Sequence, residues 1–441
     1  MSAYTTTTPS APDSELTGTI IWCHPRSCST AFERAFIQRS HIDHVIFHEP
    51  TGDFAYYARD RTNFRFAQSL CETEDKERYE RSLEQVLLDM LAAKGKDAKG
   101  KKYIFVKDMA QYILPRQTLQ ALHPDSKVYN PAGKEFEPAS DAQQMPSAYV
   151  RSSLGADASV GQLREAGAKE AASLASAFTS ARASNNTLDL TIASNPTLLP
   201  TPLLRRFKHT FLIREPSKSV PSYYKCCQDR AGGFEYFDGA EAGYKELAIL
   251  HSWISNRDST FHTSQGDREG LPTTVADFGK PVKQPMPPPL IDATVLLAYP
   301  NHVVQQYCEA IDIPFMESMM SWESAASPAQ QKPLPLPPTS DTAGKDGDVA
   351  TNGSTTGSFA KWGAFHAAAE KSTGFGSAAG AAQEELQKQA QKQTDLSLVG
   401  WYDREALSKK LEADVLETID ASIAAYRYLY SNQSILAPAK A

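Results

Sequence analysis

Short runs of consecutive apolar residues recur along the chain and indicate buried strands. An apolar run bounded by turn residues is typical of a strand that is covered on both faces of a sheet. The runs lie at residues 19–23, 45–47, 103–106, 209–213 and 290–291. We therefore expect these five segments to form the core of the fold.

Helical periodicity occupies the stretches between these runs. Apolar residues recur at three-and-four spacing in residues 76–94, and similar patterns predict helices at 243–255, 301–311 and 403–430. A further helix is expected to follow Ser217. The alternation of strands and helices predicts an α/β fold with a central parallel sheet flanked by helices. We expect the last helix to pack on the domain and close it.

Two low-complexity stretches interrupt this alternation. Residues 124–200 are dominated by Ala, Ser, Gly, Pro and Asn, and residues 325–358 by Pro clusters and Gly, Ser, Thr and Asp. Segments with so few large apolar residues bury little surface on folding. We expect two insertions, the first partly disordered with one alanine-rich helix within residues 160–182, and the second a flexible surface segment.

The ends of the chain have a different composition from its middle. Residues 1–16 are rich in Ser, Thr and Pro, so we expect a disordered N-terminus, a single domain over 17–430 and a flexible tail over 431–441. The N-terminus lacks the apolar core of a signal peptide, and no later stretch reaches ~18 unbroken apolar residues. These features predict a cytoplasmic protein without a membrane segment.

The charge and the cysteines narrow the range of ligands. The chain has 441 residues and a formal charge of −7, so its net charge would not attract nucleic acid or anionic membranes. Any anionic ligand must be held by a local site, and we expect a small molecule. The six cysteines show no paired metal-ligand spacing, and Cys226 and Cys227 are adjacent. This usage predicts reduced thiols and no metal centre.

The first apolar run leads into a loop that is suited to binding an anion. Arg26 and hydroxyl residues stand between the strand and a helix-like segment that begins near Thr30. The first helical turn has free backbone N–H groups and partial positive charge, and Ser27, Ser29 and Thr30 offer hydroxyls to oxyanions. The alternative is an ordinary capped helix after a strand.

Titratable residues end the second and third runs. His48 and Glu49 follow residues 45–47, and Lys107 follows residues 103–106. Ligands of open α/β sheets bind at the carboxyl ends of the strands, where these side chains are expected. Adjacent strand residues face opposite sides, so we expect only one of His48 and Glu49 to point into the site. Alternatively, Glu49 caps a turn, and Lys107 forms a structural ion pair with Asp108.

A second loop complements the first. The fourth run ends at Arg214, and Ser222 lies eight residues later across a helix start. A strand, a Pro-Arg-Ser-x-Ser-Thr loop and a helix, with a later strand that ends in Arg and a Ser eight residues on, resembles the sulfotransferase family. This family uses 3′-phosphoadenosine 5′-phosphosulfate (PAPS) and has a P-loop-like fold, and the likeness is to its bacterial and fungal branch.

Segments outside the two loops extend the resemblance. Residues 105–109 look like the lysine-bearing strand of the family, and residues 290–322 are similar to its segment with an aspartate-ended strand, a helix and an Ile-Pro-Phe turn. Trp362, His366 and residues 372–375 look like its C-terminal nucleotide-side loop. His366 alone is more typical of a packed or surface histidine than of a base.

The resemblance implies a role for each matched residue. Sulfuryl transfer is an in-line displacement that depends on positioning and on fixed positive charge. The acceptor also needs a proton acceptor with a pKa near the working pH, which would require Glu49 to be partly desolvated. The expected catalytic residues are Glu49 as base with His48 as competitor, and Arg26 and Lys107 as cations; the expected cofactor-binding residues are Arg26, Ser27, Cys28, Ser29, Thr30, Arg214, Ser222, Thr373 and Gly374.

The chain also departs from the family pattern. Cys28 stands where this loop commonly has Gly, which adds a side chain where backbone would approach the ligand. A non-catalytic nucleotide-binding scaffold of the same fold therefore remains an alternative. A kinase is disfavoured because the G-x-x-x-x-G-K-[ST] pattern is missing. We expect a reaction of secondary metabolism that transfers a sulfuryl group to a hydroxyl of a small apolar or aromatic molecule and uses no metal.

Overall fold

A computed structural model describes most of the chain. The described residues are 17–40, 42–66, 71, 76–92, 103–132, 146–155, 157–184, 188–229, 234–263, 281–323, 365–366, 369, 371–376, 381–392 and 399–439. The expected disordered N-terminus 1–16 and the insertion 325–358 lie outside them, as does Trp362. No helix within the described ranges is long and apolar enough to cross a membrane.

The predicted parallel sheet is confirmed, and all five apolar runs are strands of it. The strands are β1 Thr17–Cys23, β2 His44–His48, β3 Tyr103–Met109, β4 Phe207–Ile213 and β5 Leu290–Asp292. Their order is β2-β3-β1-β4-β5, and every neighbouring pair is parallel. The chain places β3 on one side of β1 and β4 on the other. A crevice at such a switch point is where open α/β sheets bind ligands.

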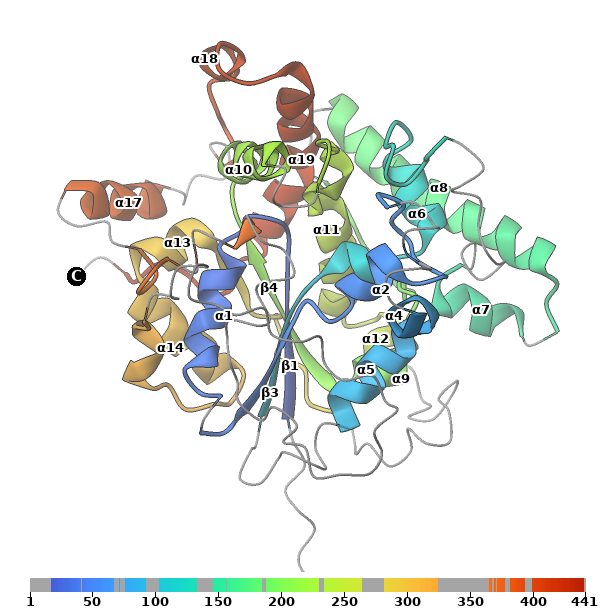
Figure 1. Ribbon diagram of the computed structural model, residues 1–441, viewed down its shortest axis with the longest axis horizontal. Coiled ribbons are helices and arrows are strands. Elements are labelled where there is room, and N and C mark those ends of the chain that lie inside the picture. Colours follow the sequence, from blue (N-terminus) through green and yellow to red (C-terminus); the bar gives the residue numbers. More distant parts are fainter. Residues whose placement is uncertain are drawn as a thin grey trace, which may run out of the picture.

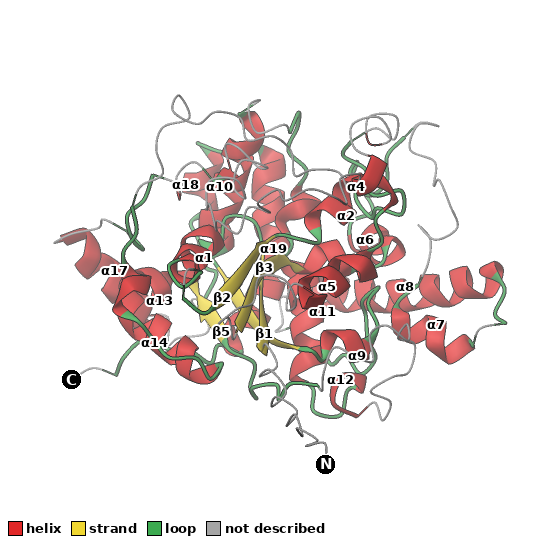
Figure 2. Ribbon diagram, turned by 60° about the horizontal axis from the view of Figure 1, so that its bottom comes forward, coloured by secondary structure: helices red, strands yellow, loops and turns green. Residues whose placement is uncertain are grey.

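Helices cover both faces of the sheet because its strands are apolar on both faces (Figures 1 and 2). Ile21 and Phe105 pack against α1, α13 and α14, whereas Ile20 and Val106 lie in the other core with α5, α11 and α19. This alternation is the period of two of a β-strand. The helices are α1 Ser29–Ile37, α2 Gly52–Tyr57, α4 Lys76–Glu80, α5 Leu83–Ala92, α6 Arg116–Leu122, α7 Ala148–Leu154, α8 Val160–Ser184, α9 Thr201–Leu204, α10 Pro216–Gln228, α11 Tyr244–Ser255, α12 Thr260–Thr263, α13 Ala293–Ala298, α14 Pro300–Ala310, α17 Ala381–Lys392, α18 Arg404–Ser408 and α19 Ala413–Ser431, with short 3-10 turns η1 Ala110–Ile113, η5 Gly239–Ala242 and η7 Glu317–Met320.

Within the stretch 124–200, the described residues 124–132, 146–155, 157–184 and 188–200 include two helices. The alanine-rich helix is present as α8, and α7 precedes it. Leu174 and Phe178 of α8 are buried in the core, as are Leu188 and Leu199 after it. A few apolar side chains on one helix face are enough to anchor this segment, although its average hydrophobicity is low.

The tail 431–441, which we expected to be flexible, packs against the sheet as far as residue 439. Ile435 is buried and forms a bridge to Ile291 of β5. The backbone N–H of Ile435 donates to the Leu290 carbonyl at 3.2 Å, and the Leu290 N–H donates to Ser434 Oγ at 2.9 Å. β5 is an edge strand, and the tail covers backbone groups that an uncovered edge would expose.

Candidate functional site

A pocket opens at the carboxyl ends of β1, β3 and β4, at the predicted place. Its polar lining comes from Arg26, Ser29, Thr30, Glu49, Lys107, Arg214, Glu241 and His366. Aromatic side chains form much of the remaining wall, among them Tyr56, Tyr112, Tyr223, Phe234 and Phe365. Charged groups therefore meet an apolar surface in one cavity, as is common in small-molecule sites.

The first loop presents an uncapped helix start to this pocket. Arg26 and Cys28 both have left-handed backbone, with φ of 64° and 69°. Cys28 is the N-cap of α1, and its side chain makes no capping hydrogen bond within the described residues. The N–H groups of the first turn thus remain available to an anion. The left-handed φ also explains why this position suits glycine.

The two predicted loops meet in space. Arg26 Nε donates to Ser222 Oγ at 3.0 Å, and Arg214 Nη1 donates to the Arg26 carbonyl at 3.0 Å. The Arg214 N–H donates to His24 Nε2 at 2.9 Å, so the imidazole of the first loop fixes the second. These contacts hold two guanidinium groups beside the start of α1.

Of the remaining residues predicted to bind the cofactor, some line the pocket and others do not. Ser29 and Thr30 line the pocket, as does Gly374. Ser27 Oγ is buried and has no hydrogen-bond partner among the described residues. The carbonyl of Thr373 accepts a hydrogen bond from the Trp322 N–H at 3.2 Å, which holds the C-terminal loop to the body of the domain.

Glu49 and Lys107 form a buried ion pair. Lys107 Nζ donates to Glu49 Oε1, and both side chains are almost fully buried. Burial alone would raise the pKa of Glu49, but Lys107, His48 and His366 lower it to about 2. The pair also raises the pKa of Lys107, against the effect of its burial. Glu49 is therefore desolvated as expected, yet it is a weaker base than expected.

Asp108 has partners of its own and is not the counterion of Lys107. Its carboxylate accepts hydrogen bonds from the N–H and the hydroxyl of Thr51, at 3.0 and 2.7 Å, and from the Met109 N–H. Burial raises the pKa of Asp108 to about 7. Lys107 thus belongs to the pocket, and Asp108 ties β3 to the turn after β2.

Glu49 lines the pocket and His48 is not among its lining residues, although the two side chains belong to one cluster. β2 ends at His48, and Glu49 has a φ of 43°, which breaks the alternation of a regular strand. His48 Nε2 lies 3.9 Å from Glu49 Oε1 and 3.2 Å from His366 Nε2. His366, which we expected to be a packed or surface histidine, is buried against His48 and lines the pocket.

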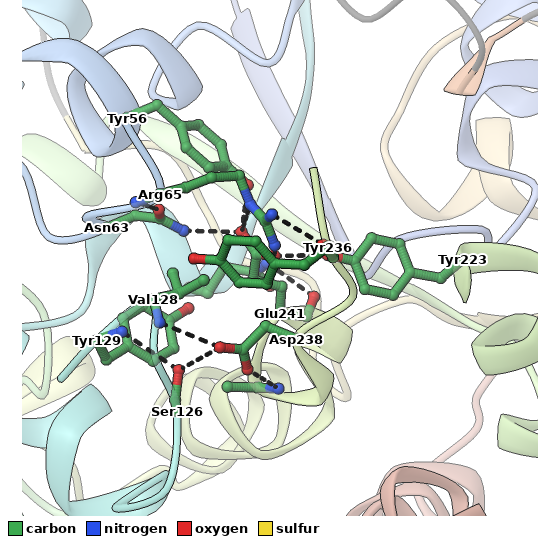
Figure 3. Close-up of polar contacts among 12 residues, drawn as sticks. Tyr56, Asn63, Arg65, Ser126, Val128, Tyr129, Tyr223, Tyr236, Asp238 and Glu241 are labelled. Carbon is green, nitrogen blue, oxygen red and sulfur yellow. Dashed lines mark hydrogen bonds and ion pairs between the residues drawn. The ribbon is translucent and has the colours of Figure 1, made fainter. Parts of the chain in front are cut away.

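A second buried carboxylate supports the aromatic wall (Figure 3). Glu241 accepts hydrogen bonds from Tyr56 Oη at 3.1 Å, Asn63 Nδ2 at 2.9 Å and Tyr223 Oη at 2.6 Å, and it pairs with Arg65. No local sequence pattern indicates this network, because its members come from separate loops and helices. Tyr56 and Tyr223 are buried in the core and also line the pocket.

Comparison with known proteins adds little to this geometry. No family model matches the chain, and no solved structure matches it. A protein of Arabidopsis thaliana, branched-chain-amino-acid aminotransferase-like protein 2, is 27% identical over 130 residues. The matched stretch covers 30% of this chain and 17% of the Arabidopsis protein. A match of this extent leaves the function to be argued from the site.

Proposed function

We propose that this protein is a sulfotransferase of the P-loop-like fold that moves a sulfuryl group from PAPS to a hydroxyl of a small aromatic or apolar molecule. The observation that carries the proposal is the contact between Arg26, Ser222 and Arg214. It brings two cations from distant loops to the uncapped start of a helix. Two anionic groups on one nucleotide would use these features together.

In the proposed reaction, the first loop would bind the 5′-phosphate side of PAPS and the second loop its 3′-phosphate. The acceptor oxygen bonds to sulfur as the bond from sulfur to the 5′-phosphate oxygen breaks, and 3′-phosphoadenosine 5′-phosphate leaves. Negative charge grows on the leaving phosphate, where Arg26 and the first turn of α1 would stabilise it. Lys107 stays charged beside Glu49 and supplies a further cation. Arg214 would hold the 3′-phosphate.

The proton of the acceptor hydroxyl passes to the cluster of His48, Glu49 and His366. Glu49 binds a proton weakly because Lys107 and both histidines lower its pKa to about 2. Burial keeps the pKa of His366 well below its ordinary value, so this imidazole is neutral at pH 7. Glu49 is thus a poor acceptor for the proton, and His48, whose Nε2 lies 3.9 Å from Glu49 Oε1, is the alternative acceptor in the cluster.

The apolar wall supports an aromatic acceptor. The ring centroid of Tyr56 lies 5.7 Å from that of Tyr112 and 6.0 Å from that of Phe234, within the range of aromatic contacts. Ring contacts of this kind bind a flat acceptor and exclude water from the reacting oxygen. An acceptor with many sulfate or carboxylate groups would not suit this wall.

The name of the Arabidopsis relative raises amino-group transfer as another activity. That chemistry requires a lysine amine that forms a Schiff base as a neutral nucleophile. Lys107 is the lysine among the described residues of the pocket lining, and its ion pair with Glu49 holds the amine in its charged form. The pocket therefore favours sulfuryl transfer.

Calorimetry with nucleotides tests the proposal. We expect 3′-phosphoadenosine 5′-phosphate to bind more tightly than adenosine 5′-phosphate, and ATP to bind poorly. Arg214→Ala should weaken binding of the 3′-phosphorylated nucleotide by about 10–100-fold, the value of a hydrogen bond to a charged group, with a much smaller effect on adenosine 5′-phosphate. Arg404→Ala, at an exposed arginine paired with Asp420, is the matched control and should change neither.

Three outcomes would overturn it. Equal losses for both nucleotides in Arg214→Ala would remove the 3′-phosphate assignment. Binding of ATP alone would favour a kinase, and binding of neither nucleotide would exclude both the enzyme and a nucleotide-binding scaffold. The scaffold differs from the enzyme in a further way, since it binds 3′-phosphoadenosine 5′-phosphate but releases none from PAPS in the presence of phenolic acceptors.

A further inference from the structure

Two imidazoles and a carboxylate converge beside the pocket. The ligand atoms of His48, Glu49 and His366 all lie within 4.8 Å of one another. All three side chains are removed from water, since those of His48 and Glu49 are each 2% exposed and His366 is 3% exposed. Two histidines and one carboxylate with an open side are a common ligand set for a catalytic divalent metal.

The separations match those around a metal ion. Tetrahedral zinc at 2.0–2.1 Å from two imidazole nitrogens sets those nitrogens about 3.3 Å apart. The Nε2 atoms of His48 and His366 are 3.2 Å apart. Their ring centroids are only 4.7 Å apart, with an angle of 76° between the planes. In a straight N–H···N hydrogen bond, the distance between the ring centroids would exceed the distance between the nitrogens by two ring radii. The observed centroid distance is shorter, so both Nε2 atoms point toward a shared third position.

Both imidazoles also have the outer hydrogen bonds that metal-bound histidines show. His48 Nδ1 lies 2.6 Å from Glu33 Oε2, and His366 Nδ1 lies 3.0 Å from Thr30 Oγ1. When the Nδ1 atoms donate these bonds, both Nε2 atoms carry lone pairs that face each other across 3.2 Å. A cation between them removes that repulsion, and a carboxylate on the far nitrogen fixes the tautomer and strengthens the ligand.

The local charge leaves room for a dication. Glu33 is fully buried, and its Oε1 has no hydrogen-bond partner among the described residues. Glu33 and Glu49 are two carboxylates beside the histidines, and Lys107 is paired with Glu49. Lys107 donates to Glu49 Oε1, whereas among the described residues Glu49 Oε2 has only a long contact of 3.5 Å with Tyr112 Oη. Oε2 can thus turn to a metal while Oε1 keeps its lysine.

We propose that His48, His366 and Glu49 bind one divalent ion of the zinc class, through the two Nε2 atoms and one carboxylate oxygen, with the fourth position open to the pocket. Glu33 and Thr30 orient the two histidines. This departs from the expectation of a metal-free protein. Its consequence for the reaction rests on the proposed function: a hydroxyl that contacts the metal loses its proton more readily, and the metal then replaces the imidazole as the means of activating the acceptor.

Metal content and cobalt spectroscopy test the site on the full chain without an affinity tag. After removal of metal with a chelator, we expect one Zn²⁺ or Co²⁺ per chain to rebind, and Co²⁺ to give the visible absorption of a tetrahedral nitrogen and oxygen site. His366→Ala should abolish that absorption. Glu33→Gln should keep the stoichiometry but weaken binding by about 10–100-fold, the usual effect of losing an outer carboxylate.

A matched histidine provides the control. His123 also bonds a carboxylate, with its Nε2 2.6 Å from Glu246 Oε1, but it lies outside the cluster. His123→Ala should leave metal content and the cobalt spectrum unchanged. Circular dichroism checks the fold of each variant, and if His366→Ala does not fold, the wild-type spectrum and the Glu33→Gln affinity decide.

The result is separable from that of the nucleotide experiment. Absence of stoichiometric Co²⁺ binding by the wild-type protein would overturn the site, as would a cobalt spectrum that survives His366→Ala. Calorimetry with 3′-phosphoadenosine 5′-phosphate on the same chelated sample reports the nucleotide loops alone. A chain that binds nucleotide but no metal keeps the proposed function with an imidazole base, and a chain that binds metal but no nucleotide keeps only the metal site.

Discussion

Glu49 and Glu241 are two buried carboxylates on the wall of one pocket, and their surroundings are opposite in kind. Glu241 accepts hydrogen bonds from two tyrosines and an asparagine and pairs with Arg65. Glu49 pairs with Lys107, has a long contact of 3.5 Å with Tyr112 Oη, and lies 3.9 Å from His48 Nε2. Both pKa values are lowered, so both groups are ionised at neutral pH.

Under the proposed function, Glu241 is a structural carboxylate and Glu49 a reactive one. The oxygens of Glu241 are saturated with donors, so this group holds the aromatic wall in place. Glu49 has few donors and is surrounded by groups that can gain, lose or share a proton. Arg65 keeps its charge under all conditions, whereas a buried lysine such as Lys107 can lose its proton when its partner is removed. We therefore expect substitution of Glu49 to affect turnover and substitution of Glu241 to affect stability.

Replacing Glu49 tests its proposed role in the reaction, and the resulting loss of turnover should be the largest effect among these predictions. Glu49→Gln removes a charge from the proton-accepting cluster, and we expect turnover to fall by about 10²–10⁴-fold, the usual contribution of acid–base groups. Nucleotide binding should stay nearly intact. Release of 3′-phosphoadenosine 5′-phosphate from PAPS with phenolic acceptors measures turnover, and calorimetry measures nucleotide binding. Undiminished turnover would move the role to His48.

Replacing Glu241 tests the structural side. Glu241→Gln leaves Arg65 buried with an uncompensated charge, and we expect the free energy of unfolding to fall by about 3–5 kcal/mol. Urea unfolding measures this loss. Glu405→Gln, at an exposed residue whose carboxylate lies 3.2 Å from Lys409, is the control and should cost less than about 1 kcal/mol. A loss as small as the control would mean that Glu241 does not support the wall.

Acid titration of stability tests the charge state of Glu49. Its pKa is depressed from 4.5 to about 2, so its stabilising effect is present above pH 4.5 and is lost as the pH falls toward 2. Glu49→Gln should flatten the stability curve in this window by an amount on the order of 2 kcal/mol. Unfolding free energies across the window measure it. An unchanged slope would show that the pKa of Glu49 is not depressed.

Asp108 should affect the pH dependence of the unfolding free energy in the opposite direction from Glu49. Burial raises its pKa from 3.8 to about 7, so its effect on stability is full below pH 3.8 and is lost as the pH rises toward 7. Asp108→Asn should therefore flatten the curve between these values and leave the acid limb alone. A change confined to the acid limb would contradict the raised pKa.

The smallest effect concerns the loop rather than the carboxylates. Cys28→Gly places glycine at a φ of 69°, where a side chain is strained, and should raise the free energy of unfolding by about 1 kcal/mol. Cys28→Ala keeps the Cβ atom and should not. Thermal or urea unfolding distinguishes them. If both variants behave alike, the strain does not come from the Cβ atom.

The fold was predictable in its sheet and less so at its margins. Each apolar run became a strand because burial on both faces leaves a continuous local signal. In the described parts of the stretch 124–200 and of the tail 431–441, single anchors such as Phe178 and Ile435 are buried against the core. Average composition does not reveal such anchors.

The site was predictable where one loop carries several groups. The first loop, with Arg26 at an uncapped helix start, lies where the pattern placed it. The depressed pKa of Glu49 was not predictable, because it depends on Lys107 from another strand. Glu241 was missed because its partners, Tyr56 and Arg65 among them, are far from it in the chain.

The sequence by itself determined the parallel strands, the loop with Arg26 after β1 and the loop with Arg214 after β4, because these depend on neighbouring residues and local backbone geometry. The tertiary structure alone decided which groups face one another. His48 and His366 are 318 residues apart in the chain and 3.2 Å apart in space. Arg26 and Ser222 are 196 residues apart and share a hydrogen bond. Such contacts arise when the sheet and its helices close around the pocket, and no local pattern specifies them.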